Sequence, residues 1–421
     1  MEYPKNNLTK QNDLSSPVNE RSGKSQAIVV ATGFFTLFSL IGIMFYGLPF
    51  FYDFWVKELG WSRAKVTSGD AVAKIVVGLF GFFVGWLMDK FGPKRLMVIG
   101  VLMCGLAFIG LGHFTTLWQF YFFYILSATS YLLAGALPNQ VLISRWFTSG
   151  RGKAMGIAYL GVGVGGMLVP QIARWLNTQY GWHNALTILG IMIIAISLPL
   201  VLLVKDAPPG FAQPSSTDKK KKIPMSQLFK SRRFVLLVIG SVCSIAAVAG
   251  TIKNLKLFFS LDLQFTQEHA ANILSIILFS SILGRLLMGW LADKFSKKYV
   301  MVLIYALVAI SIPLLYFTHV PGVIYLFAFL FGIALGGDYM IIPLMAAELF
   351  GVKVLGRIMG LVLTFDGFGD ALSPMLVSWI RDKSGSYANG FAVLILLAII
   401  GTIAILLIPE KKKTGDEPVI S

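Results

Sequence analysis

Charged side chains are scarce in this chain. Asp, Glu, Lys and Arg make up 13% of its 421 residues, whereas hydrophobic residues make up 56%. A soluble globular domain carries about 25% charged residues, so the composition excludes an ordinary soluble protein. The apolar runs are continuous rather than alternating, which excludes the strands of a membrane β-barrel. We therefore expect an all-α integral membrane protein, because a helix satisfies its own backbone hydrogen bonds in lipid.

Cysteine and histidine are also rare. Cys104 and Cys243 are the two cysteines, each inside an apolar run, and no spacing for a disulfide or a zinc site is present. The four histidines fall at the ends of apolar runs or in loops, so none is expected to relay protons within a membrane. The sequence shows no nucleophile motif, phosphate-binding loop or metal-ligand cluster. We therefore expect that the protein is not an enzyme and binds no cofactor.

Long apolar segments, by contrast, are abundant. A helix needs roughly 20 apolar residues to cross the hydrocarbon core of a bilayer, and twelve segments reach this length. The twelve predicted spans are residues 27–52, 67–88, 95–113, 117–145, 152–177, 185–204, 234–260, 270–292, 299–317, 321–349, 355–380 and 388–408.

The distribution of basic residues predicts the orientation of these spans. The formal net charge is +16, which by itself could indicate a nucleic-acid partner. If the N-terminus is cytoplasmic, 26 of the 36 Lys and Arg lie in cytoplasmic segments and six lie in or beside outer segments. This is the positive-inside pattern. It predicts that both termini are cytoplasmic and that the charge faces anionic lipid rather than nucleic acid.

Two copies of one unit make up the chain, offset by 204 residues. Gly85–Phe91 returns as Gly289–Phe295, and similar pairs recur in other spans. Internal repeats in apolar chains are typical of secondary transporters. The repeat predicts two pseudo-symmetric six-helix bundles, 27–204 and 234–408. A cytoplasmic linker, 205–233, rich in Pro, Ser and Lys, would join them, with cytoplasmic tails at 1–26 and 409–421.

The loop after the second span carries a family resemblance. Gly85-x-x-x-Asp89-Lys90-x-Gly92-Pro93-Lys94-Arg95 resembles the signature between helices two and three of the major facilitator superfamily. The second copy departs from it, with Ser296 where a glycine is usual. The resemblance implies the twelve-helix fold of that superfamily. It also implies inter-helix ion pairs that latch the outward-facing state, here expected from Asp89, Arg95, Asp293 and Lys297.

A second resemblance narrows the expected substrate. Arg145-Trp146-Phe147, followed by Arg151–Gly156, resembles the entry to helix five of monocarboxylate and oxalate–formate carriers. Arg285 falls where those carriers keep an intramembrane arginine, which implies that it binds the substrate carboxylate. Three positions depart from these carriers. Ser281 stands where the proton-coupled monocarboxylate carriers of animals have an aspartate, and helix one has no lysine before Lys57, at its outer edge, where those carriers have one. Asp366 stands where oxalate-type exchangers have a lysine. The reversed charge at residue 366 disfavours a two-cation clamp for a dicarboxylate.

Intramembrane charges are costly and mark functional sites or permanent pairs. Arg285 either binds an organic anion, since its planar guanidinium suits a carboxylate, or pairs with an aspartate. Asp366 and Asp370 lie one turn apart and would repel each other if both were ionised, so either is a candidate proton carrier or a structural partner of Arg285 or Lys253. Asp338 has the same two interpretations.

Other charged residues have simpler expected roles. Lys256 is expected to snorkel at its helix end, while Lys253 is a candidate for attracting anions. Asp70 and Lys74 have i,i+4 spacing, which predicts a local salt bridge. Asp262, at the outer end of helix seven, is either a proton-entry group or a solvated acid.

Aromatic residues supply the remaining site candidates. Tyr124, Ser127 and Tyr131 share one helical face by spacing, which would suit hydrogen bonds to a small acid or, alternatively, helix packing. Tyr339 follows Asp338 in a helix expected to line the central cavity, and we include it among the candidate substrate contacts. The glycines between 161 and 166 predict close helix packing rather than a nucleotide loop.

Together these patterns predict a secondary carrier of small organic anions. We expect proton-coupled symport of a monocarboxylate such as lactate or pyruvate, by a monomer in the inner (plasma) membrane. The alternatives are an anion exchanger without proton coupling, a carrier of larger acids or drugs, and a non-transporting sensor. For the sensor we recognise no signalling domain.

Overall fold

A computed structural model describes residues 17–208 and 225–409. These residues are almost entirely helical and contain no strand. The N-terminal bundle consists of α1 (Pro17–Thr36), η1 (Leu37–Gly47), η2 (Leu48–Phe51), α2 (Tyr52–Leu59), α3 (Arg63–Phe91), α4 (Pro93–Leu111), α5 (Leu117–Ala134), α6 (Ala136–Trp146) and α7 (Arg151–Leu203).

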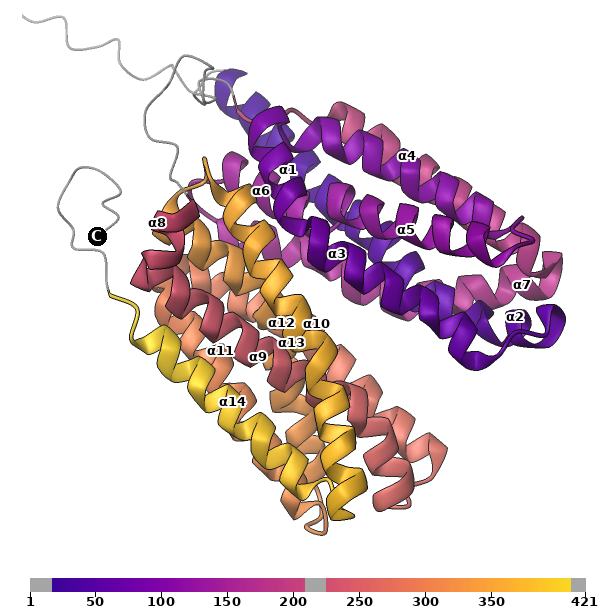
Figure 1. Cartoon of the computed structure of the whole chain (residues 1–421). Coiled ribbons are helices and arrows are strands. Elements are labelled where there is room, and N and C mark those ends of the chain that lie inside the picture. Colours follow the sequence, from indigo (N-terminus) through magenta and orange to yellow (C-terminus); the bar gives the residue numbers. More distant parts are fainter. Residues whose placement is uncertain (1–16, 209–224, 410–421) are drawn as a thin grey trace, which may run out of the picture.

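The short helix α8 (Met225–Lys230) precedes the C-terminal bundle. Figure 1 shows the two bundles side by side. The C-terminal one consists of α9 (Arg232–Leu257), η3 (Phe258–Asp262), α10 (Gln267–Lys294), α11 (Lys297–Ser311), η4 (Ile312–Phe317), α12 (Val323–Phe350), α13 (Leu355–Ser384) and α14 (Ala388–Leu406).

Eleven helices of the described chain are long and apolar enough to cross a membrane. One of them, α7, has 53 residues and would be about 80 Å long if straight, far more than the roughly 30 Å of a bilayer core. It breaks at Gly181, whose φ of 72° and ψ of 161° are non-helical and suit glycine. The two predicted spans 152–177 and 185–204 therefore lie on either side of this break, which gives twelve crossings.

The repeat is visible in the backbone as well as in the residue types. Ser62 caps α3 by accepting a hydrogen bond from the Lys65 N–H, and Thr266 caps α10 in the same way. The turns before both caps contain a left-handed residue, Gly60 with φ 64° and Gln264 with φ 52°. Equivalent turns thus start equivalent helices in the two bundles.

Two predicted boundaries differ from the structure. Helix α1 begins at Pro17, inside the predicted tail 1–26, because a helix need not end where its apolar run ends. The predicted linker 205–233 includes ordered pieces: α8 is helical, and the Asp206 Oδ1 accepts a hydrogen bond from the Lys94 N–H at 2.7 Å. Residues 1–16, 209–224 and 410–421, which include most of both tails and the lysine run, lie outside the described residues.

The bundles meet along two helix pairs, α3 with α13 and α7 with α10. Glycines allow the backbones to approach: a Cβ on Gly356 would lie 2.7 Å from the Gly85 carbonyl oxygen, and one on Gly289 would lie 2.6 Å from that of Gly152. These two contacts are related by the repeat. In Figure 1 the bundles are closest near α8 and diverge toward the end that carries α2. We call the region between the diverging helices the inter-bundle space.

Candidate functional site

Arg285 lies on α10 at the junction of the two bundles. Its Nη1 donates a hydrogen bond to the Ser281 Oγ, one turn earlier, at 3.0 Å. The guanidinium rests against α7, where a Cβ on Gly163 would lie 3.1 Å from Nη1. The absence of a side chain at residue 163 therefore lets a C-terminal-bundle arginine reach the N-terminal bundle.

No carboxylate lies within salt-bridge distance of Arg285 among the residues that the structure describes. Its electrostatic neighbours are instead the hydroxyl groups of Tyr46 and Tyr159. The interpretation of Arg285 as half of a permanent pair with an aspartate is therefore wrong. A half-buried guanidinium with neutral partners retains donors for an anion.

The first membrane span contributes its π-helical segment η1 to this junction. Such segments are rare and frequent at functional sites, and η1 extends over 11 residues. Near its end, Tyr46 lies within electrostatic range of Arg285, and Phe45 packs edge-on against Tyr131 of α5, with ring centroids 5.3 Å apart. The segment thus brings aromatic side chains to the inter-bundle space.

Tyr131 and Tyr339 come from opposite bundles. Tyr339 of α12 lies within electrostatic range of Tyr131 and of Asp370 on α13. It is 39% exposed although it lies midway along its helix, so its ring lines open space rather than the core of the C-terminal bundle. Both tyrosines therefore border the region between the bundles.

Asp370 is held by two lysines from different bundles. Its carboxylate lies 2.9 Å from the Nζ of Lys253 on α9 and 3.7 Å from the Nζ of Lys74 on α3. The predicted local pair of Asp70 with Lys74 is wrong, because the Asp70 oxygens accept hydrogen bonds from the Tyr52 hydroxyl at 2.7 and 2.8 Å. Lys74 instead reaches across to the other bundle.

Asp338 and Asp366 are buried in the C-terminal bundle, and no basic partner of either is found in the part of the chain that the structure describes. Both lie near the buried Tyr305. The Asp338 Oδ1 accepts a hydrogen bond from the Ser244 Oγ at 3.2 Å. The Asp338 Oδ2 and both Asp366 oxygens have no hydrogen-bond partner among the described residues.

Ser241 lies beside the Asp366 carboxyl group, but its hydroxyl donates to the Val238 carbonyl. These acids form no group that could hold a metal ion within the described residues. Two buried acids without a cation are costly when ionised, so the cluster suits groups that bind and release a proton.

Two other predicted site residues lie away from the junction. Tyr124 is buried inside the N-terminal bundle, and its hydroxyl donates to that of Tyr52 at 3.3 Å. Tyr124 and Tyr131 therefore do not form one site face: Tyr124 packs inside the bundle, whereas Tyr131 borders the inter-bundle space. Asp262 forms an ion pair with Arg381 at 2.8 Å, at the opposite end of the bundle from α8.

The two predicted latch aspartates contact the opposite bundle. Both cap a helix N-terminus: Asp89 accepts from the N–H groups of Gly356 and Arg357, and Asp293 from those of Gly152 and Lys153. Asp89 also pairs with the Arg357 side chain at 3.1 Å. The predicted basic partners lie elsewhere, since Lys297 pairs with Glu348 at 3.2 Å and Arg95 is exposed, with no ion pair found in the described part of the chain.

Sequence reasoning did not identify Tyr46, Tyr159 or Gly163 as neighbours of Arg285. Tyr159 and Gly163 are one turn apart in the glycine-rich part of α7, so close approach of another helix to this face was the available signal. The contact of Lys74 with Asp370 gave no local signal, because its two residues lie in different bundles.

Comparisons with known proteins agree with this architecture. The sequence model of the Major Facilitator Superfamily matches residues 33–271 and 237–420. The uncharacterised MFS-type transporter YcxA of Bacillus subtilis is 26% identical over 370 residues, which cover 84% of this chain and 88% of that protein. Monocarboxylate transporter 13 of Rattus norvegicus is 27% identical over 397 residues, with 91% of this chain and 89% of that protein covered.

A solved structure shows the same fold. The proton:xylose symporter XylE aligns with a TM-score of 0.72 at 17% identity, over 93% of this chain and 97% of that chain. At this identity the likeness concerns the fold alone. With both halves matched by the family model and the repeat present in sequence and backbone, the chain belongs to the Major Facilitator Superfamily and is a multi-pass membrane transporter rather than an enzyme.

Proposed function

We propose that the chain transports a small monocarboxylate, of the lactate or pyruvate type, together with a proton. The observation that carries the proposal is the Arg285 guanidinium, half-buried at the junction of the bundles, whose partners among the described residues are all neutral. An organic carboxylate would supply the charge that this site lacks, through paired N–H donors. Tyr46 and Tyr159 supply hydroxyl groups near it. The similarity to a monocarboxylate transporter supports the same substrate class.

Proton coupling would use the buried acids Asp338 and Asp366. Ionising either one in this setting leaves a charge without a cation, so a proton is retained until the cluster gains access to water. Asp370 is less suited to the task, because Lys253 and Lys74 already stabilise its ionised form. In this mechanism the anion on Arg285 and the proton on the acid cluster reorient together.

Alternating access would follow from the two bundles rocking about the junction. The contacts of Asp89 and Asp293 close the end near α8, which we propose is the cytoplasmic end. The structure would then correspond to an outward-facing carrier, with both termini in the cytoplasm, working as a monomer in the inner (plasma) membrane.

Uptake of labelled lactate into proteoliposomes tests the proposal. With an inward proton gradient, we expect accumulation above equilibrium in the wild-type protein and none in Arg285→Ala. Uptake that requires internal substrate and ignores the gradient would indicate an exchanger instead. No uptake of lactate or pyruvate under either condition would contradict the substrate class, and vesicles preloaded with oxalate, formate or larger acids would then identify the alternative.

A further inference from the structure

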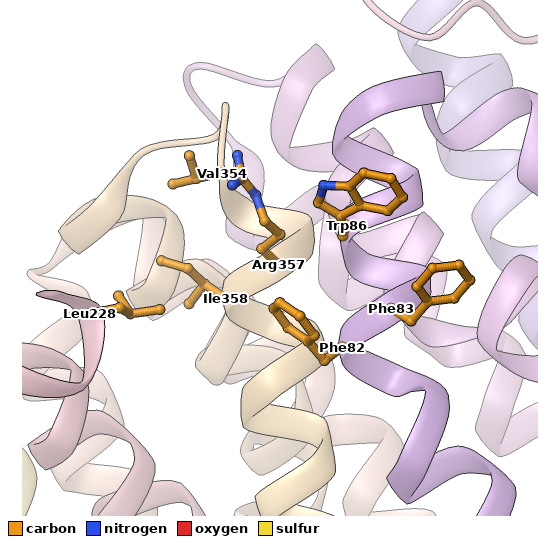
Figure 2. Close-up of a pocket in the computed structure, with 7 residues that line it drawn as sticks. All are labelled: Phe82, Phe83, Trp86, Leu228, Val354, Arg357 and Ile358. Carbon is orange, nitrogen blue, oxygen red and sulfur yellow. The ribbon is translucent and has the colours of Figure 1, made fainter. Parts of the chain in front are cut away.

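A pocket of about 420 Å³ lies between the bundles, beside the Asp89 contact and apart from Arg285. Figure 2 shows its walls, with α3 on one side, α13 in the middle and α8 on the other side. Six apolar side chains and one arginine line it: Phe82, Phe83, Trp86, Leu228, Val354, Ile358 and Arg357. The pocket therefore has an apolar floor and a basic edge.

The basic edge of the pocket has N–H donors that make no hydrogen bond within the described residues. Arg357 uses its Nε to bind Asp89 at 3.1 Å, and no hydrogen bond of its two terminal nitrogens to another described residue is found. Lys90 lies over the Trp86 ring, with its Nζ 5.1 Å from the centroid. One cationic side chain thus lines the apolar pocket and a second stacks on the ring of a lining residue, which fits an amphiphile with a negatively charged head.

The pocket opens on the flank of the molecule that faces lipid. Along α3, a predicted membrane span, Leu79, Phe83 and Trp86 are 71%, 51% and 38% exposed. Such exposure of apolar side chains in a membrane protein marks contact with acyl chains. Trp86 and Lys90 lie in the last turns of the helix, where aromatic and basic residues meet the headgroups.

We propose that this pocket binds an anionic phospholipid. Its phosphate would contact the terminal nitrogens of Arg357, and one acyl chain would lie against Phe82, Trp86 and Ile358. Because both α3 and α13 contribute to the walls, the pocket exists only while the bundles are together at this end. A bound lipid would therefore stabilise the closed arrangement of this end, since a ligand favours the state that binds it. The proposal is independent of the transported substrate.

The internal repeat supplies a matched control position. Trp290 and Lys294 are the repeat equivalents of Trp86 and Lys90, with the Lys294 Nζ 4.2 Å from the Trp290 ring centroid. The two indoles are almost equally exposed, at 37% for Trp290 and 38% for Trp86. Helix α8 lines the pocket beside Trp86 through Leu228 (Figure 2), and Trp290 is not among the residues that line that pocket. General attraction of anionic lipid would therefore affect both indoles, whereas the pocket would affect Trp86 alone.

Tryptophan quenching tests the proposal on the full chain. The protein is placed in phosphatidylcholine vesicles that contain phosphatidylglycerol or phosphatidylcholine brominated on one acyl chain. The signal of each indole is the difference between the wild-type protein and Trp86→Phe or Trp290→Phe. We expect half-maximal quenching of Trp86 at about fivefold less brominated phosphatidylglycerol than brominated phosphatidylcholine, with no such preference at Trp290.

Two variants and one competitor complete the test. Val354→Phe, which fills the pocket, and Arg357→Gln, which removes the basic edge, should each abolish the preference at Trp86. Equal quenching by the two lipids, or a preference that is the same at both indoles or survives in both variants, would overturn the proposal. Displacement by inorganic phosphate would do so too, because the phosphate group alone would then suffice.

Discussion

Arg285 places a positive charge inside the membrane protein, at a cost in free energy, and has few interaction partners among the described residues. A charged side chain inside a membrane protein costs about 2.5–3.5 kcal/mol on insertion scales, and a charge of this kind is usually balanced by an acid. Here the described partners are the Ser281 hydroxyl and two tyrosines. A ligand carboxylate can therefore form the stabilising ion pair that no described acid forms with Arg285.

Replacing Arg285 with Gln should weaken transport strongly. Loss of a hydrogen bond to a charged group costs about 1.5–3 kcal/mol, which corresponds to a fall of about 10- to 150-fold in the uptake rate at low substrate concentration. Lys383→Gln, which removes an exposed positive charge at the far end of α13, is the control and should transport normally. Equal uptake by both variants would refute the assignment of Arg285.

Asp338→Asn should separate proton coupling from translocation. The amide keeps the size of the buried group but cannot exchange a proton, so gradient-driven accumulation should disappear while exchange of labelled for unlabelled substrate continues. Accumulation and exchange are measured in the same proteoliposomes. Asp366→Asn and Asp370→Asn extend the test, and unaltered accumulation in all three variants would eliminate the aspartate mechanism.

At the scale of helices, the apolar runs predicted the spans well because each crossing must be continuous in lipid. Features set by the backbone were less predictable. The π-helical segment η1 has no recognisable residue pattern. The spans 152–177 and 185–204 were predicted as two helices joined by a loop, whereas the structure has one helix, α7, with a break at Gly181. Helix α8 was hidden within a linker whose composition is dominated by charge, Pro and Ser.

Gly85→Leu should push α3 away from α13. A side chain at residue 85 would overlap the Gly356 carbonyl, and overpacking costs about 1–3 kcal/mol. We expect a lower thermal midpoint and loss of most uptake. Gly78, on the same helix, has no heavy atom within 4 Å of an added Cβ, so Gly78→Leu should retain both. Equal behaviour of the two variants would show that the contact of α3 with α13 is not needed.

At the scale of the whole molecule, the repeat organises the closed end. Each of Asp89 and Asp293 caps a helix of the opposite bundle, and each lies beside a glycine contact. The sequence predicted these aspartates from their motif but assigned them the wrong basic partners. Pairing across bundles depends on how two helices separated by some 270 residues in sequence are rotated, and a local motif does not encode that rotation.

A reversible cross-link should show whether this end must open during transport. Asp89→Cys combined with Arg357→Cys, with the native Cys104 and Cys243 changed to Ser, places two thiols where an ion pair now joins the bundles. Oxidation should reduce uptake to background, and a reductant should restore it to the level before oxidation. Each single-cysteine protein under the same oxidant is the control. Full uptake by the cross-linked protein would contradict alternating access through this end.

The uncompensated guanidinium of Arg285 also determines how the proposed carrier responds to membrane voltage. With substrate anion and proton bound, Arg285, the acid cluster and their cargo together carry no net charge. An empty carrier that kept its proton would instead move one positive charge outward, against a potential that is negative inside, at a cost of up to about 2.3 kcal/mol per 100 mV. An empty carrier that has released the proton bears a compensating carboxylate and avoids that cost. The electric field would thus slow the return of an empty carrier that still holds its proton. Because such a return wastes the proton gradient, the membrane voltage would strengthen the coupling between proton and substrate transport.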